Sequence, residues 1–239
     1  MEWHDDGLII GLKKHGETSL ILEAMTRAHG RHLGLVRGGR SKRWQPLLQP
    51  GNSVALVWRA RLDEHLGLYA AEVVKPRAAN LMASALALHG LNHLATLLRL
   101  LAERDPHPAL YETASTIADH LSETRTAAAL VRFELAILAE LGFGLDLATC
   151  AATGVREDLI YVSPKSGRAV SRGSGAPYHE RLLPLPTFLG DESVEGGSAA
   201  VAEAFRLTGY FLERDVFQAR ELQMPHARQA YLAELAKLK

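Results

Sequence analysis

The chain has 239 residues, of which 47% are hydrophobic and 23% are charged, and its net charge at pH 7 is zero. These values are ordinary for a soluble globular protein with one large or two small domains. No apolar run has transmembrane length, and acidic residues follow Met1 where a secretory signal has basic ones, so we expect a cytoplasmic protein. The single cysteine, Cys150, excludes an internal disulfide.

The zero net charge hides a separation of charge along the chain. Residues 1–79 contain 12 basic residues against 8 acidic ones, whereas residues 80–239 contain 15 against 19. Between Glu23 and Asp63 there are eight basic residues and no acidic one, namely Arg27, Arg31, Arg37, Arg40, Lys42, Arg43, Arg59 and Arg61. A positive patch attracts polyanions even on a neutral protein, so the pattern predicts a polyanionic partner.

Residues 1–78 are predicted to form a small β-barrel. Segments at 8–12, 19–25, 32–36, 53–58 and 66–74 have the length and apolar pattern of strands, with glycine and proline turn signals between them. Five strands in so few residues favour a closed barrel, and the OB-fold is the obvious candidate.

The rest of the chain, residues 79–239, is predicted to be a helical domain. Apolar residues at three- and four-residue steps indicate one helix from Leu81 to Leu101, and further helices are expected at 109–121, 125–141, 197–216 and 225–238. Residues 145–193 are irregular, with one hairpin near 159–162 and 168–170. The predicted class is therefore α+β, with an N-terminal five-stranded OB-fold followed by helices and a small insert.

A basic segment between two predicted strands is the strongest candidate for a binding site. Its glycine pair, Gly38-Gly39, allows close approach of the backbone to a phosphate strand, and its cations can neutralise phosphates and release counterions. Trp44 offers a flat face on which an unpaired base can stack. The candidate DNA-binding residues are Arg37, Arg40, Lys42, Arg43 and Trp44, with Arg31, Arg59 and Arg61 in support. Composition alone leaves open the alternative of a solvated basic loop without a ligand.

Two patterns have metal-site spacing but lack ligands. His89 and His93 stand four apart on a predicted helix, without a third ligand on that face. A pair of knuckles typical of a zinc ribbon is occupied by Cys150, Thr153, Ser171 and Ser174. Hydroxyl groups do not hold Zn²⁺ as thiolates do, so we predict no metal and no other cofactor. A phosphate loop and a nucleophile elbow are also absent from the sequence, so we do not expect an enzyme.

Arg132 lies in an otherwise apolar predicted helix. One interpretation is an arginine that buries its stem and keeps its head in water. The other is a cation beside an apolar groove that receives an acidic peptide ending in an aromatic residue.

Three motifs, in this order and separation, resemble the bacterial RecO family of recombination mediators. They are Glu17-Thr-Ser-Leu20, Gly38-Gly-Arg-Ser-Lys-Arg43, and Arg132-Phe-Glu-Leu135 continuing to Leu141-Gly-Phe-Gly144. Cys150-Ala-Ala-Thr-Gly154 looks like the opening of that family's zinc-ribbon insert. Family members with four cysteines in this insert bind zinc there. We do not expect zinc in this chain, because Thr153, Ser171 and Ser174 stand in place of three of the cysteines.

The resemblance implies binding to single- and double-stranded DNA, annealing of complementary strands and association with the nucleoid. It also implies that RecR and single-strand-binding protein (SSB) are partners in loading recombinase onto SSB-coated strands, with Arg132 receiving the C-terminal tail of SSB. Two alternatives stay open: an OB-fold adaptor that binds only proteins, and an OB-fold protein that binds RNA. The second stays open because no residue of the sequence is identified as recognising or excluding the 2′-hydroxyl that distinguishes RNA from DNA.

Overall fold

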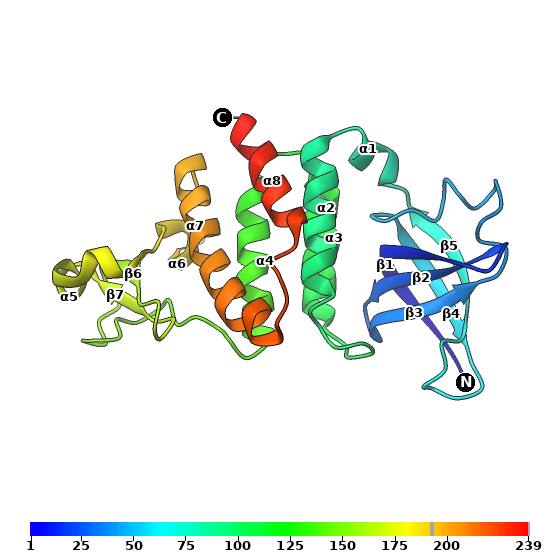
Figure 1. Ribbon diagram of the computed structural model, residues 1–239, viewed down its shortest axis with the longest axis horizontal. Coiled ribbons are helices and arrows are strands. Elements are labelled where there is room, and N and C mark those ends of the chain that lie inside the picture. The colour runs from blue at the N-terminus through cyan, green and yellow to red at the C-terminus, as the bar shows by residue number, and fades with distance from the viewer. Residues whose placement is uncertain (192–193, 239) are drawn as a thin grey trace. The chain divides into compact units, whose positions relative to one another are not determined.

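The structure is a computed structural model and describes residues 1–191 and 194–238 (Figure 1). Its first five strands are β1 (Glu2–His15), β2 (Ser19–Thr26), β3 (Gly30–Val36), β4 (Ser53–Arg59) and β5 (Leu68–Lys75). They close a barrel in the order β1-β2-β3-β5-β4, and β4 returns to β1. All pairs are antiparallel except β3 with β5. This topology confirms the predicted five-stranded OB-fold.

Alternate strand residues fill the barrel. In β4, Val54, Leu56 and Trp58 are buried while the residues between them face outwards. Buried polar atoms in this aromatic interior are paired: the Trp58 indole donates to the carbonyl of Leu66 at 3.0 Å, and the Tyr69 hydroxyl lies 2.9 Å from Nδ1 of His32. Such pairing lets the small barrel bury large side chains without the cost of unsatisfied polar groups.

Strand β1 is longer than the apolar pattern predicts. Its first half pairs with β4, from Glu2 opposite Arg59 to Leu8 opposite Ser53, and its second half pairs with β2 as far as His15. Most of the flanking residues are polar and exposed, although Trp3 and Leu12 are half-buried. An apolar pattern reports only the buried centre of such a strand, at Gly7–Gly11.

Three helices follow the barrel: α1 (Ala78–Met82), α2 (Ala85–Leu98) and α3 (Pro108–His120). The predicted single helix starting at Leu81 is divided because Ser84 is extended and caps α2, its side chain accepting a hydrogen bond from the amide of Ala87 at 3.3 Å. These helices form one compact unit with the barrel and α8 (His226–Lys237), covering Met1–Thr126 and His226–Leu238. This compact unit is defined by which residues contact one another in space. The boundary at residue 78 is instead placed where the sequence changes from strand-like to helix-like, so the two divisions of the chain differ.

A buried arginine ties the barrel to α3 within this unit. Arg77 is 7% exposed and donates to Oδ1 of Asp119 at 2.6 Å, to Oγ of Ser53 at 2.6 Å and to the carbonyl of Gly51 at 3.2 Å. Lys75 also contacts Asp119, at 2.6 Å. Burial raises the pKa of the Asp119 carboxyl, but hydrogen bonds from Arg77 and Lys75 outweigh it and lower the pKa below its usual value.

The second compact unit covers Ala127–Pro225. It contains most of α4 (Thr126–Glu140), the short helix α6 (Thr187–Gly190) and α7 (Ser198–Phe211), together with a small sheet of β6 (Leu159–Val162), β7 (Ala169–Ser171) and β8 (Leu183–Pro184) in the order β7-β6-β8. The predicted hairpin is therefore confirmed. The helix expected at 197–216 changes after Phe211 into a π-helical turn, Leu212–Phe217. Among the described residues no helix is long and apolar enough to cross a membrane.

Candidate nucleic-acid interface

The basic segment lies between β3 and β4 and is built from successive tight turns. Gly38 has a φ of +67°, a left-handed conformation that favours glycine, and its carbonyl accepts from the amide of Ser41 at 3.0 Å. Further along, the amide of Leu48 donates to the carbonyl of Trp44 at 2.8 Å. Leu48 is buried in the barrel core and half-buried Trp44 packs against that core. The turns therefore hold the segment against the barrel.

Arg40 joins the basic segment to the turn between β1 and β2. Its backbone amide donates to the carbonyl of Thr18 at 3.0 Å, and Nη1 of its guanidinium donates to the carbonyl of Gly16 at 2.6 Å. The side chain is half-buried, so Arg40 positions two loops as well as carrying charge. Within the described residues its guanidinium makes this one hydrogen bond, which leaves N–H donors for a ligand.

Three cations of the segment, Arg37, Lys42 and Arg43, are exposed. Within the described part of the chain they form no ion pair with a carboxylate. The guanidinium of Arg43 lies 5.8 Å from the ring centroid of Trp44, within cation–π range. A cation and a flat ring are thus presented side by side at the surface.

Two lysines that the sequence analysis did not select lie beside this segment. Lys13 and Lys14 are exposed near the end of β1, and Lys14 is opposite Leu20, which is itself opposite Val36. Two strand spacings, about 10 Å, therefore separate Lys14 from the strand end that leads into Arg37. The sequence signal for these lysines is Lys13-Lys14-His15 just before Gly16, where β1 ends and the turn begins. These residues precede the acid-free stretch between Glu23 and Asp63, so the count of basic residues in that stretch does not include them. The basic cluster, as used below, comprises Lys13, Lys14, Arg37, Arg40, Lys42 and Arg43.

Other predicted DNA-binding arginines already have partners. Arg31 contacts Glu23 at 3.1 Å and the carbonyl of Leu101 at 3.3 Å, and its side chain is 19% exposed. Arg59 makes two hydrogen bonds with Glu2, at 2.7 and 3.0 Å, which raise the pKa of Arg59 and lower that of Glu2. These neutralised arginines contribute less to the surface potential than the basic cluster does.

Arg61 is exposed in the loop between β4 and β5, and no carboxylate of the described residues pairs with it. Arg104 holds that loop by donating to the carbonyls of Asp63 and His65. The last residue of the loop, Gly67, accepts from the amide of Leu35 at 3.0 Å, two residues before Arg37. The loop with Arg61 therefore adjoins the strand that leads into the basic cluster.

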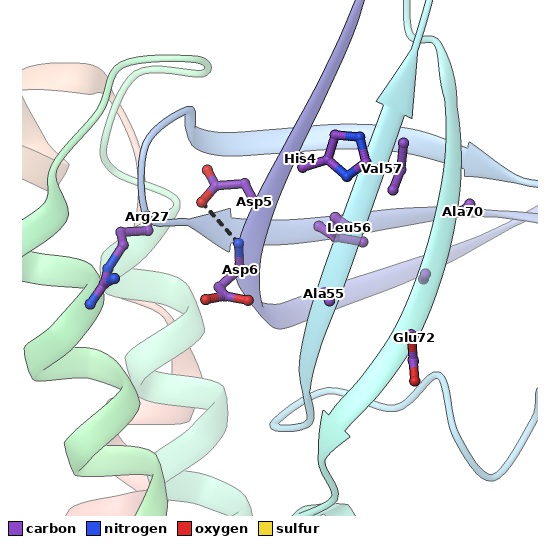
Figure 2. Close-up of a pocket in the computed structure, with 10 residues that line it drawn as sticks. His4, Asp5, Asp6, Arg27, Ala55, Leu56, Val57, Ala70 and Glu72 are labelled. Carbon is purple, nitrogen blue, oxygen red and sulfur yellow. Dashed lines mark hydrogen bonds between the residues drawn. The ribbon is translucent and has the colours of Figure 1, made fainter.

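A hollow of about 730 Å³ occupies a different part of the barrel, on the outer face of β1, β4 and β5 (Figure 2). Asp6 and Glu72 are among the side chains that line it. Its carboxylates repel phosphates, so it does not extend the nucleic-acid interface.

Arg132 lies on α4 in the second unit and is half-buried. Its Nη2 donates to the carbonyl of Phe188 at 2.8 Å, and its Cζ lies 5.3 Å from the centroid of the Phe188 ring. The neighbouring α4 residues Phe133, Ile137 and Leu138 are buried, so the cation stands at the edge of an apolar core. Among the residues that the structure describes, one nitrogen of the guanidinium is engaged in a hydrogen bond, so its other N–H donors can meet an anion.

The four knuckle positions converge in the structure, but their donor set does not fit zinc. Cys150 Sγ lies 3.5 Å from Oγ of Ser171, whose amide donates to Sγ at 3.3 Å, and Oγ of Ser171 lies 3.3 Å from that of Ser174. Burial raises the pKa of the Cys150 thiol, but hydrogen bonds from Ser171, Thr153 and the amide of Ala152 lower it to about 5. One cysteine sulfur and three neutral hydroxyls are a poor zinc set, because hydroxyls do not replace the missing thiolates. Among the described residues no group of three or more His, Cys, Asp or Glu is placed to hold a metal.

Together, the closed OB-type barrel, its basic cluster and the helical region that follows define an OB-fold protein with a helical extension. Comparison with known families gives a narrower assignment. The family model for the N-terminal part of recombination protein O matches residues 1–77, and the model for its C-terminal part matches residues 83–222. The chain therefore belongs to the RecO family of DNA repair proteins.

Curated relatives are similar over nearly their full length. The DNA repair protein RecO of Methylocella silvestris is 65% identical over 239 residues, which cover 99% of this chain and 97% of that protein. Those of a Chelativorans species and of Mesorhizobium japonicum are each 60% identical, covering 99% of this chain and 96% and 94% of theirs.

Proposed function

We propose that the chain is a DNA-binding mediator of recombinational repair that acts in the cytoplasm, at the nucleoid, without catalysing a reaction. It binds single- and double-stranded DNA and anneals complementary strands. The observation that carries the proposal is the basic cluster, in which Arg37, Lys42 and Arg43 are exposed and have no carboxylate partner among the described residues. Arg43 also lies beside the ring of Trp44. Membership of a family of DNA repair proteins supports the same role.

The cluster binds by charge and stacking. Each phosphate that meets a guanidinium or ammonium group releases a condensed counterion, which favours binding at low salt. The exposed part of the Trp44 ring accepts an unpaired base by stacking, which tolerates any sequence. Guanidinium and ammonium groups that are protonated at neutral pH are neither nucleophiles nor general bases, so the chemistry of these side chains is binding.

Annealing follows from neutralisation of the phosphate backbones. Two complementary strands repel each other through their phosphates, and a cationic surface that holds one strand lowers the repulsion felt by the second. Because stacking on Trp44 reads no base edge, the strands remain free to pair with each other.

The proposal includes two protein partners. With RecR, the chain helps to load recombinase on single strands coated by SSB. The acidic C-terminal tail of SSB binds at Arg132 on α4. Support for this assignment comes from the place of Arg132 at the edge of the apolar core and from the donors of its guanidinium that remain beyond the bond to Phe188.

The test is binding of matched single-stranded DNA, duplex DNA and single-stranded RNA across a salt series, with annealing measured in parallel. We expect the logarithm of the association constant to fall linearly with the logarithm of the salt concentration for both DNA forms. Substitution of Arg40 and Arg43 by alanine should lower the single-strand slope by about 0.7 for each lost phosphate contact. Absence of DNA binding at low salt would overturn the proposal, and a clear preference for RNA would favour an RNA-binding OB protein.

A further inference from the structure

The outer face of β1, β4 and β5 carries a hollow whose chemistry is opposite to that of the basic cluster (Figure 2). Two rows of side chains cross these strands: His4, Val57 and Ala70 form one, and Asp6, Ala55 and Glu72 form the other. The short side chains of Ala55 and Val57, at the centre of the rows, leave open the space that forms the hollow. The carboxylates of Asp6 and Glu72 flank Ala55 from the neighbouring strands.

The two carboxylates have no hydrogen bond or ion pair within the part of the chain that the structure describes, and both residues are exposed. The other charged groups at the rim are already engaged. Asp5 accepts from the amide of Ala28 and from the ring of His29, each at 2.8 Å, and Arg27 is paired with Glu112. Arg27 also attracts Asp6, but three carboxylates and one guanidinium line the hollow, so its net charge is negative.

We propose that this hollow is a docking surface for a segment of a partner protein that carries arginine or lysine residues. Long basic side chains have an apolar stem that covers alanine and valine and a charged head that meets a carboxylate. Asp6 and Glu72 are two strand spacings apart, about 10 Å, and side chains on one face of an extended segment repeat every 7 Å or so. Basic residues two positions apart in such a segment can therefore reach both carboxylates.

Other occupants fit less well. Nucleic acid is repelled by the carboxylates, whose sign is opposite to that of the basic cluster. Addition of a β-strand needs a free edge, and here β4 is paired with β1 on one side and with β5 on the other. Recognition at this face is therefore through side chains, by charge complementarity over a small apolar floor.

The probe for the test is the peptide Ac-Ala-Arg-Ala-Arg-Ala-NH2, titrated into the full chain while the methyl signals of Ala55 and Ala70 are followed by NMR. We expect saturable shifts at these methyl groups, no such shifts with the peptide that has glutamate in place of arginine, and binding about tenfold weaker in the Asp6→Asn/Glu72→Gln variant. The matched control is Asp63→Asn/Glu64→Gln, which removes the same charge from an exposed loop and should bind the peptide as the unaltered chain does.

Two results would overturn the docking surface: shifts confined to other residues, or equal loss of affinity in both variants. A single-stranded DNA oligonucleotide separates this inference from the proposed function. It should perturb the basic segment, Arg37–Arg43, and leave Ala55 and Ala70 unchanged. If it shifts the alanine methyl groups as the peptide does, the hollow is a nucleic-acid site and the inference fails, whereas DNA binding itself stands.

Discussion

The barrel carries two kinds of cation, and they differ in what lies opposite them. On the strands, Arg59 faces Glu2 across the β1–β4 pair and Arg31 reaches Glu23 on the neighbouring strand. In the turns between β3 and β4, Arg37 and Arg43 have no paired strand to supply a carboxylate. A count of basic residues along the sequence therefore overstates the surface charge wherever a carboxylate lies opposite, as it does at Arg31 and Arg59. Paired cations should serve the fold, and unpaired ones should serve binding.

The largest effect in this comparison is expected at the most buried paired cation. Arg77→Ala removes a guanidinium that joins Asp119, Ser53 and Gly51, and it leaves buried acceptors without a donor. We expect a loss of about 3 kcal/mol in the free energy of unfolding, measured by urea denaturation. DNA affinity of the folded fraction should stay unchanged. A variant of normal stability with weak DNA binding would contradict the division between the two kinds of cation.

The barrel interior should also respond to pH through His32. Burial, followed by the charge of Arg104, lowers the pKa of His32 to about 4 in the folded chain, against 6.5 in the unfolded chain. As pH falls, the unfolded chain takes up this proton first. The contribution of neutral His32 to the free energy of unfolding is therefore complete above pH 6.5. It is lost as pH falls toward 4, which lowers the free energy of unfolding by up to about 3 kcal/mol.

His32→Gln isolates this contribution, because the amide can still pair with Tyr69 but does not titrate. The unfolding free energy of the variant should depend less steeply on pH between 6.5 and 4 than that of the unaltered chain. His15→Gln, at an exposed position, is the control. Equal pH dependence in all three proteins would show that His32 does not carry the effect.

In the second unit, Arg132 tests whether a cation with one engaged donor still binds an anion. Arg132→Ala should weaken binding of an acidic peptide ending in phenylalanine by at least about tenfold, since one charge-assisted contact contributes about 1.5–3 kcal/mol when partly desolvated. Fluorescence anisotropy of a labelled peptide measures it. Binding to naked DNA should remain intact. Equal weakening of both ligands, or of neither, would assign Arg132 a structural role beside Phe188.

The smallest effect is expected at Cys150, whose neighbouring ligand positions are hydroxyls. Cys150→Ser preserves a hydrogen-bonding group beside Ser171, so below pH 5, where the Cys150 thiol is protonated, the free energy of unfolding should change by less than about 1 kcal/mol. Metal analysis of the unaltered chain should find no stoichiometric zinc. The triple substitution Thr153→Cys, Ser171→Cys and Ser174→Cys should instead bind zinc, because the four positions already converge. Zinc in the unaltered chain would show that other ligands complete the site.

The features that the sequence predicted well are local ones. The barrel strands and the hairpin each follow from neighbouring residues, whose alternation and turn signals are visible directly. The pairing of Arg59 with Glu2 joins residues 57 positions apart, and that of Arg31 with the carbonyl of Leu101 spans 70. Such contacts depend on register and on how helices pack on the barrel, which a single sequence does not contain. The same holds for the hollow, whose two carboxylates come from β1 and β5.

The most direct test of the difference between paired and unpaired cations compares two double variants with the same loss of charge. Arg37→Ala/Arg43→Ala removes unpaired cations, and Arg27→Ala/Arg59→Ala removes two exposed arginines that are paired with Glu112 and Glu2. The measurement is the salt dependence of single-stranded DNA binding. The first variant should lose about 1.4 from the magnitude of the log–log slope and the second should lose almost none. Equal losses in the two variants would contradict the account, because net charge alone would then set DNA binding.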